Sequence, residues 1–447
     1  MHPYLPNTEQ EIKAMLDTIG VKSTDELFED IPASLKLSRK LNLSDSLSEF
    51  EIRKHFKELA SKNTSIEDKV CFLGAGIYDH YIPSVIPQLI SRAEFFTSYT
   101  PYQPEISQGS LQAAFEYQSM ICELTGMDVS NISLYDGATA AAEASVLACV
   151  STRRKKVLVS NTVSPETRAV LKTYFQYRNM DVVEVSSIEG QTDIDDLKSK
   201  LDKDTAGVLL QYPNFFGIIE DISKYEPIIH ENKSLMMLYS DPIALGLLKS
   251  PGELGADMAL GDGQALGLPL NFGGPTLGFI NVKEKLLRKM PGRIVGQSVD
   301  SNGNRAFVLT LQAREQHIRR QDATSNICSD QTLNAIRAGM YLAVVGKEGI
   351  KEVANSCLNK ANYAYKELQK LENVQALFEG PIFKEFAIKT KASSEKVLQA
   401  LLEAGILGGY SLSSTDYGLE NAILIAVTEK RTKEEIDKLV SVIGGVR

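Results

Sequence analysis

The alternation of short apolar runs with amphipathic stretches between residues 130 and 285 constrains the fold most. Helical patterns such as 164–177 and 193–202 separate several of the apolar runs. This alternation predicts crossover units and a largely parallel sheet that helices cover on both faces. The apolar runs that we expect to be strands are residues 156–161, 181–187, 206–214, 234–241, 257–262 and 277–283.

The two ends of the chain follow other patterns. Residues 1–70 read as helical, and an apolar stripe at helical spacing runs through Phe50 and Phe56. From about residue 345 helices alternate with a few strands, which is typical of a small α+β domain. We therefore predict an N-terminal helical arm (1–70), a large α/β domain (71–340) and a small C-terminal α+β domain (341–447). Together they correspond to the plan of fold type I PLP-dependent transferases, the aspartate aminotransferase-like fold.

Composition excludes several classes of protein. With 43% hydrophobic and 23% charged residues, the chain should bury a sizeable core. A net charge of −9 argues against a nucleic-acid surface, and no apolar run is long enough to cross a bilayer. The N-terminus lacks the layout of a signal peptide, so we expect a cytoplasmic protein. Five cysteines without metal-ligand spacing indicate reduced, mostly buried thiols and predict no metal site: Cys71, Cys122, Cys149, Cys328 and Cys357.

The first candidate site is the start of the Ala-rich segment 134–148. Gly137, Ala138 and Thr139 open a strongly helical run, and small residues at a helix start let backbone N–H groups approach an anion such as a cofactor phosphate. The alternative is an ordinary helix cap made by Asp136 or Thr139. On this segment alone the cap is the better interpretation, so we expect a helix start without a bound phosphate.

The second candidate is Asp241, at the end of a predicted strand. In PLP enzymes an acid at such a place pairs with the protonated pyridine nitrogen, whereas the alternative is an aspartate that caps a loop. A Schiff-base lysine should then follow the next strand, about two dozen residues on. Gln264 stands there, 23 residues after Asp241, and glutamine cannot form an imine. The sequence therefore predicts a PLP-enzyme scaffold without the residue that holds PLP.

A third group of residues lies in loops rich in Pro, Gly, Tyr and Gln, which form shaped polar surface better than core. Two prolines stiffen the segment 98–104, so Tyr99, Tyr102 and Gln103 are candidates to line a small polar pocket. The alternative is that this loop only packs the arm against the large domain. The donors of a second cluster suit carboxylates or an acidic partner, or else form structural salt bridges: His317, Arg319 and Arg320.

Several of these strings, in this order, resemble the N-terminal half, or first subunit, of glycine decarboxylase P-proteins of the glycine cleavage system. The strings are YDHYIPSVI, YTPYQPEISQG, EYQSMICELTGMD, LYDGATAAAEA, GLPLNFGGP, MPGRIVG and QHIRRQDATSNIC. They span about residues 74–330. In that family the PLP lysine belongs to the second half, which accounts for Gln264. A chain of 447 residues corresponds to the form in which the two halves are separate subunits.

The resemblance implies an enzyme that is active only when both subunits are present. The complete enzyme decarboxylates glycine on pyridoxal 5′-phosphate held by the second subunit, and passes the aminomethyl unit to the lipoyl group of H-protein. This chain would bind no PLP covalently, would supply one wall of the cavity, and would assemble as a dimer of heterodimers. Two alternatives stay open: a regulatory or binding subunit outside the cavity, and an independent PLP enzyme that uses another lysine.

Overall fold

A computed structural model describes residue 4, residues 6–271 and residues 273–446 of the chain. It divides into two compact units, Met1–Thr64 and Ser65–Arg447. In the first unit, α1 (Glu9–Ile19) and α2 (Glu49–Ala60) each begin with a capping box. None of the residues in α1 or α2 is buried, and both helices expose large apolar side chains, as Phe50 and Phe56 do in α2. These two helices therefore form no hydrophobic core within the first unit.

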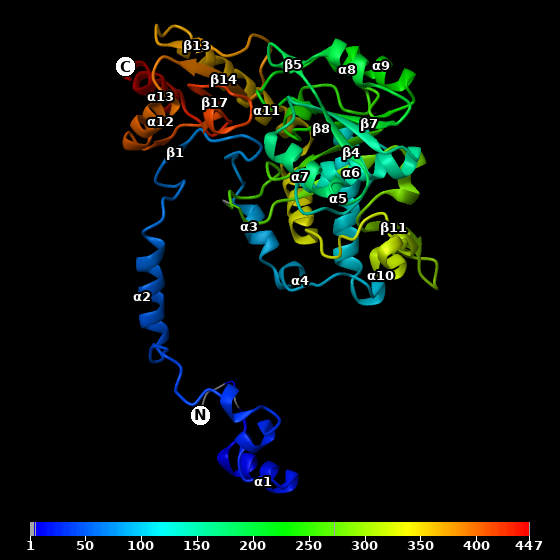
Figure 1. Cartoon of the computed structure of the whole chain (residues 1–447), viewed down its shortest axis with the longest axis vertical. Coiled ribbons are helices and arrows are strands. Elements are labelled where there is room, and N and C mark those ends of the chain that lie inside the picture. Colours follow the sequence, from blue (N-terminus) through cyan, green and yellow to red (C-terminus); the bar gives the residue numbers. More distant parts are fainter. Residues whose placement is uncertain (1–3, 5, 272, 447) are drawn as a thin grey trace. The chain divides into compact units, whose positions relative to one another are not determined.

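A seven-stranded sheet forms the centre of the second unit (Figure 1). Its strand order is β2-β10-β9-β8-β7-β3-β4, and β3, β4, β7, β8 and β9 run parallel. Strand β10 is antiparallel to both of its neighbours. The strands are β2 (Val129–Ser130), β3 (Lys156–Ser160), β4 (Asp181–Val185), β7 (Thr205–Tyr212), β8 (Leu235–Ser240), β9 (Met258–Asp262) and β10 (Gly278–Val282).

Helices cover both faces of this sheet. Val157 and Leu209 point to the face that packs against α6 (Gly137–Thr152) and α7 (Pro165–Phe175). Leu158 and Val208, their neighbours in sequence, join the opposite cluster with α8 (Ile194–Lys200) and α9 (Glu226–Glu231). Since adjacent strand residues point to opposite faces, burial of both faces explains why these strands read as continuous apolar runs. Before the sheet the chain forms β1 (Val70–Cys71), α3 (Val85–Ile90), α4 (Ala93–Phe96) and α5 (Gln108–Thr125). Between β4 and β7 it forms a separate small sheet of β5 (Ser187–Ile188) and β6 (Gln191–Thr192).

The C-terminal part contains a four-stranded antiparallel sheet of order β13-β14-β17-β16. Helices α12 (Ser394–Glu403) and α13 (Lys433–Gly445) pack with its strands in one hydrophobic cluster, which also includes the end of α11 (Thr332–Leu368). The small strands are β13 (Val374–Ala376), β14 (Glu385–Thr390), β15 (Ile406–Leu407), β16 (Tyr410–Ser411) and β17 (Ala422–Ala426). A hairpin of β11 (Ile294–Val299) and β12 (Arg305–Thr310), followed by α10 (Gln316–Arg319), lies between the two sheets in sequence.

Each apolar run predicted to be a strand between residues 156 and 283 contains a strand, and the two helical patterns named there contain helices α7 and α8. The predicted division into three domains is not tested by the two compact units. They separate after Thr64, and the predicted boundary at residue 340 lies within α11. That three-part division stays a prediction. The five cysteines are free, and Cys71, Cys149 and Cys357 are buried. In the described residues no helix is both long enough and apolar enough to traverse a bilayer.

Candidate functional site

A small cavity opens at the carboxyl ends of strands β7, β8 and β9, where open α/β sheets bind their ligands. Its space is about 40 Å³, enough for a few water molecules. Tyr239 and Asp241 reach it from the end of β8, and Asp262 reaches it from the end of β9. Lys384 and Glu385 enter from β14, so both sheets contribute to the site.

The carboxylate of Asp241 has two roles in this site. Its Oδ1 accepts the N–H of Ile243 (2.9 Å), so it caps the turn that follows β8. Its Oδ2 lies 2.6 Å from Nζ of Lys384, whose side chain is almost completely buried. An acid that could pair with a pyridinium nitrogen is thus already paired with a cation of the chain itself.

Gln264 lies directly after β9 and is only 2% exposed. Its Oε1 accepts the N–H of Tyr78 (2.9 Å), and its Nε2 donates to the carbonyls of Tyr78 (3.1 Å) and Leu268 (3.0 Å). The amide uses both its donor and its acceptor in these contacts. A lysine has three donors but no acceptor, so it could not receive the Tyr78 N–H. The position where the sequence places a missing lysine therefore carries a residue with bonds of its own.

The start of α6 is occupied by carboxylates. Asp136 Oδ1 accepts the N–H of Thr139 (2.7 Å), and Asp262 Oδ2 accepts the N–H of Gly137 (3.0 Å). Ala138 lies between these two donors in the first turn. Burial raises the pKa of Asp262 to about 6, against hydrogen bonds from Gly137, from the N–H of Gln264 and from the Thr276 hydroxyl. The helix start thus has the cap that the alternative interpretation of the sequence describes.

Glu385 binds the loop that contains Tyr78. Its Oε1 accepts the N–H of Ala75 (2.7 Å), and its Oε2 accepts the hydroxyl of Tyr78 (2.8 Å). Burial raises the pKa of Glu385 to about 7, although these two donors and the Lys384 ammonium act in the opposite direction. Tyr78 also presents its ring to Lys384, whose Nζ lies 3.7 Å from the ring centroid.

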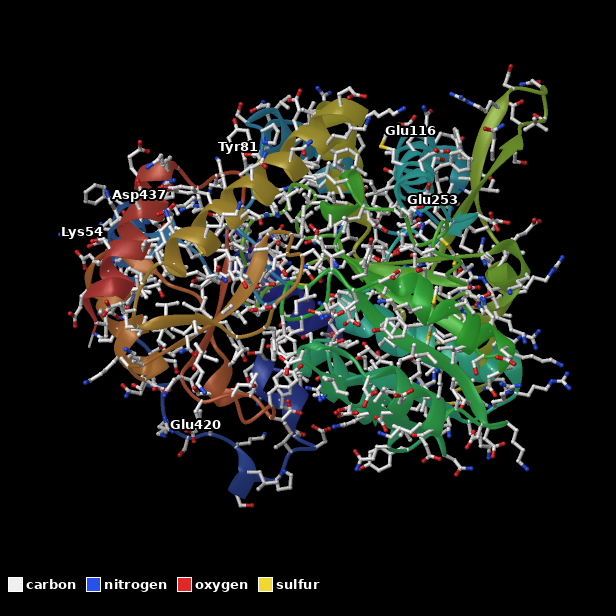
Figure 2. The ribbon with its side chains drawn as sticks, turned by 90° about the horizontal axis from the view of Figure 1, so that it is seen from above. Lys54, Tyr81, Glu116, Glu253, Glu420 and Asp437 are labelled. Atoms are coloured by element: carbon white, nitrogen blue, oxygen red, sulfur yellow. The ribbon has the colours of Figure 1, made fainter. Side chains whose placement is uncertain are left out.

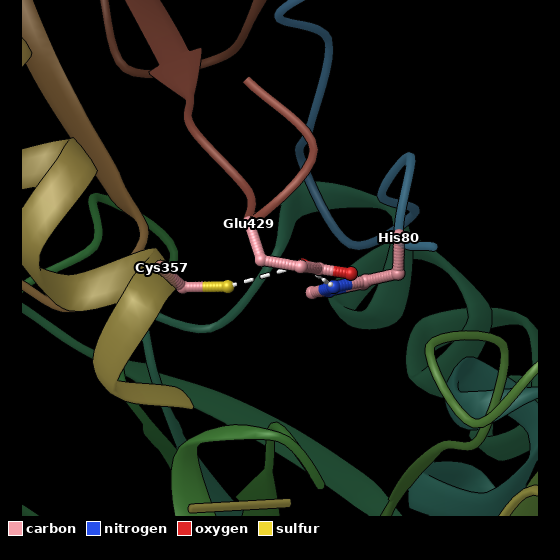
Figure 3. A group of neighbouring side chains, drawn as sticks. All are labelled: His80, Cys357 and Glu429. Carbon is pink, nitrogen blue, oxygen red and sulfur yellow. Dashed lines mark hydrogen bonds and ion pairs between the residues drawn. The ribbon is translucent and has the colours of Figure 1, made fainter. Parts of the chain in front are cut away.

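A chain of contacts continues from Lys384 to His80, and Figure 3 shows how His80, Glu429 and Cys357 lie together beyond it. Lys384 Nζ donates to Nε2 of His80 (2.9 Å), so the other ring nitrogen of His80 carries the hydrogen that it donates to Glu429 (2.7 Å). Glu429 in turn lies 3.3 Å from Sγ of Cys357. Side-chain ligand atoms of His80, Cys357 and Glu429 all lie within 4.8 Å of one another. Because both imidazole nitrogens are engaged and an ammonium faces the ring, we interpret this group as a hydrogen-bonded chain.

The proline-stiffened loop 98–104 lies at the surface. Tyr99 is 86% exposed and Gln103 is exposed as well, whereas Tyr102 binds a residue of the large domain. The hydroxyl of Tyr102 accepts a hydrogen bond from Nη2 of Arg293 (2.9 Å), and its ring lies edge-on to that of His317. The loop residues and His317 are therefore neighbours, a link that the sequence did not indicate.

The cationic cluster near residue 320 is mostly exposed. His317 Nδ1 lies 3.7 Å from a carboxylate oxygen of Glu315, and Arg319 donates to the carbonyl of Ala313 (3.1 Å). Among the ion pairs of the described residues, neither Arg319 nor Arg320 has a carboxylate partner. The backbone of Arg320 has φ +55°, an uncommon conformation for a residue other than glycine. The structural salt bridges considered for this arginine pair are thus not formed within that part of the chain.

Sequence reasoning missed the residues that fill the cavity from β14 and from the loop before α3. Tyr78 and His80 lie in a string that we quoted for its resemblance, without a role for either side chain. Lys384 and Glu385 are two charged residues directly before the apolar run 386–388 of a predicted strand, which is the signal that could have found them.

A family model described as "Glycine cleavage system P-protein" matches residues 2–443. The chain belongs to the glycine cleavage system P-protein family. It is 53% identical to a "Probable glycine dehydrogenase (decarboxylating) subunit 1" of Desulforamulus reducens, with 99% of each chain covered. It is 54% identical to a protein of the same description from Moorella thermoacetica, also with 99% of each covered. The predicted resemblance to first-subunit members of this family is confirmed over the whole length.

Solved structures agree with the family. A crystal structure of glycine decarboxylase (P-protein) of the glycine cleavage system, in inhibitor-bound form, superimposes with a TM-score of 0.91 at 40% identity, and 100% of each chain is covered. A sphingosine-1-phosphate lyase of Burkholderia pseudomallei has a TM-score of 0.65 at 14% identity over 92% of this chain and 93% of that one. That likeness concerns the fold alone. The fold type I PLP-enzyme-like architecture predicted from the sequence is confirmed.

Proposed function

We propose that this chain is the subunit of a two-subunit glycine decarboxylase that carries no PLP and lends residues to the PLP cavity of its partner. The observation that carries the proposal is Gln264 at the place of the Schiff-base lysine. Its amide is fully used by Tyr78 and Leu268. The naming of the relatives as subunit 1 implies a second subunit, to which we assign the lysine and the cofactor.

The residues of this chain do not fit PLP. A pyridinium nitrogen would compete with Lys384 for Asp241, and a phosphate at the start of α6 would meet the carboxylates of Asp136 and Asp262. A β-carbon on Gly137 would already lie 2.2 Å from the hydroxyl oxygen of Tyr239, so little space remains above the first turn. We therefore derive no chemical step through PLP in this chain. The cofactor would supply the electron sink for decarboxylation within the partner.

The complete enzyme would decarboxylate glycine and transfer the aminomethyl unit to the lipoyl group of H-protein. In this assignment Tyr99, Tyr102 and Gln103 are the residues offered to the partner's cavity. Their support is that the loop is stiffened by two prolines and that Tyr99 and Gln103 are exposed. Arg319 and Arg320 would contact an anionic group or an acidic surface of the partner or of H-protein, since neither is neutralised within the described chain.

The two alternatives predict different behaviour. An independent PLP enzyme would need another lysine, and Lys384 is the lysine that lines the cavity. Its ion pair with Asp241 and its contact with His80 argue against that role. A regulatory subunit outside the cavity would tolerate conservative changes in the loop 98–104 without loss of rate.

Reconstitution tests the proposal. This chain and a lysine-bearing second subunit are purified separately, and glycine-dependent CO2 release is measured with lipoylated H-protein. We expect no release above a no-enzyme control from this chain alone, and release when both subunits are present. Decarboxylation by this chain alone would refute the assignment. Activity of the second subunit without this chain would reduce the chain to a regulatory role.

A further inference from the structure

Side chains in the cavity and beside it hold one loop, residues 74–82. The amide of Gln264 binds the backbone of Tyr78 through both its N–H and its carbonyl, in the manner of one rung between two strands. The amide of Gln264 is removed from water, since its side chain is buried, and the Tyr78 backbone is partly buried. Buried amide pairs of this kind are costly to break, because each unsatisfied partner keeps its desolvation penalty.

Glu385 holds the beginning of the same loop. It binds the N–H of Ala75 and the hydroxyl of Tyr78. The backbone at Ala75 has φ +62°, which is unusual for a residue with a side chain, and Gly76 follows with φ +115°. A β-carbon on Gly74 would lie 2.1 Å from Oε1 of Glu385, so the carboxylate packs directly on the loop backbone. Such conformations persist only where the surroundings determine them.

The far end of the loop is bound to the residues that follow β17. Thr428 donates to the carbonyl of Asp79 (2.7 Å), and Lys430 and Arg431 pair with the Asp79 carboxylate (2.6 and 3.1 Å). Glu429 accepts the N–H of Tyr81 (2.6 Å). The backbone of the loop is therefore fixed from its first residues to Tyr81.

The Tyr81 side chain is the exposed feature of this fixed loop. It is 59% exposed and stands at the surface of the molecule (Figure 2). Further exposed apolar side chains follow Tyr81 along the chain as far as Ile106, and they include the tyrosines of the loop 98–104 that we assign to the partner's cavity. They are Val85, Phe96, Tyr99, Tyr102 and Ile106. An aromatic side chain on a rigid backbone loses little entropy on binding, which is typical of an interface anchor.

We propose that the former cofactor pocket and Gln264 beside it have become a clamp for residues 74–82, in which Gln264 is a positioning residue, and that the clamped loop presents Tyr81 to the second subunit. The clamp is a property of this chain alone. The role of Tyr81 rests on the proposed function, because it needs the second subunit as its partner. The two parts are therefore tested separately.

Amide hydrogen exchange in the isolated chain tests the clamp. Gln264→Met keeps the length of the side chain and removes all three hydrogen bonds. We expect the amides of residues 75–81 to exchange at least about tenfold faster in this variant. Gln118→Met is the matched control, since Gln118 makes the same amide pair with the backbone of Val295 (2.9 and 3.1 Å). It should leave residues 75–81 unchanged. Equal exchange of these amides in Gln264→Met and the parental chain would overturn the clamp.

Gln264→Glu gives a second, pH-dependent readout that does not depend on how well Gln264→Met folds. A protonated glutamic acid can accept the Tyr78 N–H and donate to one of the two carbonyls, whereas the carboxylate can only accept. The protection of the loop in this variant should therefore decrease as pH rises, relative to the parental chain at each pH. If the exchange protection of residues 75–81 in Gln264→Glu equals that of the parental chain at every pH, the donor groups of Gln264 do not hold the loop.

Binding to the second subunit tests Tyr81. We expect Tyr81→Ala to raise the dissociation constant of the complex at least about tenfold. Tyr177→Ala is the control, because Tyr177 is 87% exposed and lies outside the stretch 81–106. An unchanged constant for Tyr81→Ala would refute the role of Tyr81. If the parental subunits fail to assemble at all, the proposed function fails together with the role of Tyr81, while the exchange result still decides the clamp.

Discussion

At the scale of single residues, a buried carboxyl group in α6 has no ion pair among the described residues to compensate its burial. Glu143 is 1% exposed, and its Oε2 has no hydrogen-bond partner among the described atoms. Burial raises the pKa of Glu143 to about 7, and a hydrogen bond with Ser325 and the charge of Arg178 lower it only partly. Below pH 7 the neutral acid is therefore the form that the folded chain favours.

This pKa makes the stability of the chain depend on pH. The pKa of Glu143 in the folded chain lies above its ordinary value of 4.5. The contribution of this carboxyl group to stability is therefore fully present below pH 4.5, and it is lost as pH rises from 4.5 through about 7. As pH rises from 4.5 to 8, we expect the free energy of unfolding of Glu143→Gln to increase by up to about 3 kcal/mol relative to that of the parental chain. Urea unfolding at several pH values measures this difference. Glu116→Gln, at an exposed position (Figure 2), should show no such trend, and a flat difference for Glu143→Gln would contradict the expectation.

The two tyrosines of the loop 98–104 should respond differently to loss of the hydroxyl group. Tyr102→Phe removes an acceptor from Arg293, a buried cation, so we expect the free energy of unfolding to fall by about 1–2 kcal/mol. Tyr99→Phe should leave stability unchanged, because that side chain is exposed. If Tyr99 reaches the partner's cavity, the same change lowers the decarboxylation rate of the complex about tenfold or more. Parental rates with Tyr99→Phe would remove that residue from the cavity.

At the scale of elements, the start of α6 leaves no room for a side chain. A β-carbon on Gly137 would lie 2.2 Å from the hydroxyl oxygen of Tyr239 and 2.9 Å from the backbone nitrogen of Asp262. We expect Gly137→Ala to cost about 1–3 kcal/mol of stability by overpacking. Gly109→Ala in α5 is the control, since nothing lies within 4 Å there and alanine favours the helix. A lower thermal midpoint for Gly137→Ala and an equal or higher one for Gly109→Ala would agree with the structure; equal effects would not.

Six strands of the large sheet could be predicted because each contains an apolar run bounded by polar residues. The seventh, β2, is only two residues long and has no such run. The spacing of Asp241 and Gln264 was informative because neighbouring parallel strands end at one edge of the sheet, so residues that follow two such strands lie close together. Helix α11 was harder. It begins at Thr332 and contains a non-helical residue at Gly346, whereas the sequence pattern placed a helix only from residue 346. Residues 332–345 bury small and apolar side chains on several sides, so they lack an amphipathic stripe.

The side chains that close the cavity could not be predicted in the same way. Lys384 follows Asp241 by more than a hundred residues and meets it only because β14 of the second sheet approaches the end of β8. No local periodicity encodes such a contact. What the sequence does encode is the cost of burying two adjacent charges at a strand start, which demands partners somewhere in the fold.

At the scale of the whole molecule, the contacts of Lys384 from both sheets predict how the isolated chain reacts with PLP. An amine must be unprotonated and accessible to form an imine, and the Nζ of Lys384 is neither free nor exposed. It is paired with Asp241 at 2.6 Å and with His80 at 2.9 Å, and it lies against the ring of Tyr78. The two lysines after β10, Lys283 and Lys285, donate to the Gly255 carbonyl and to Asp257, away from the cavity.

We therefore expect that the isolated chain stays colourless. After incubation with PLP and reduction with borohydride, mass mapping should find no stoichiometric adduct at Lys384 or anywhere between residues 241 and 285. Scattered substoichiometric labelling of exposed lysines is the background, and it should be the same in Lys384→Met. Asp241→Asn with Lys384 retained removes the ion pair and is the most favourable variant for an adduct, since the lysine then loses its counter-charge. A specific adduct at Lys384 in the parental chain would contradict the assignment of PLP to the second subunit alone.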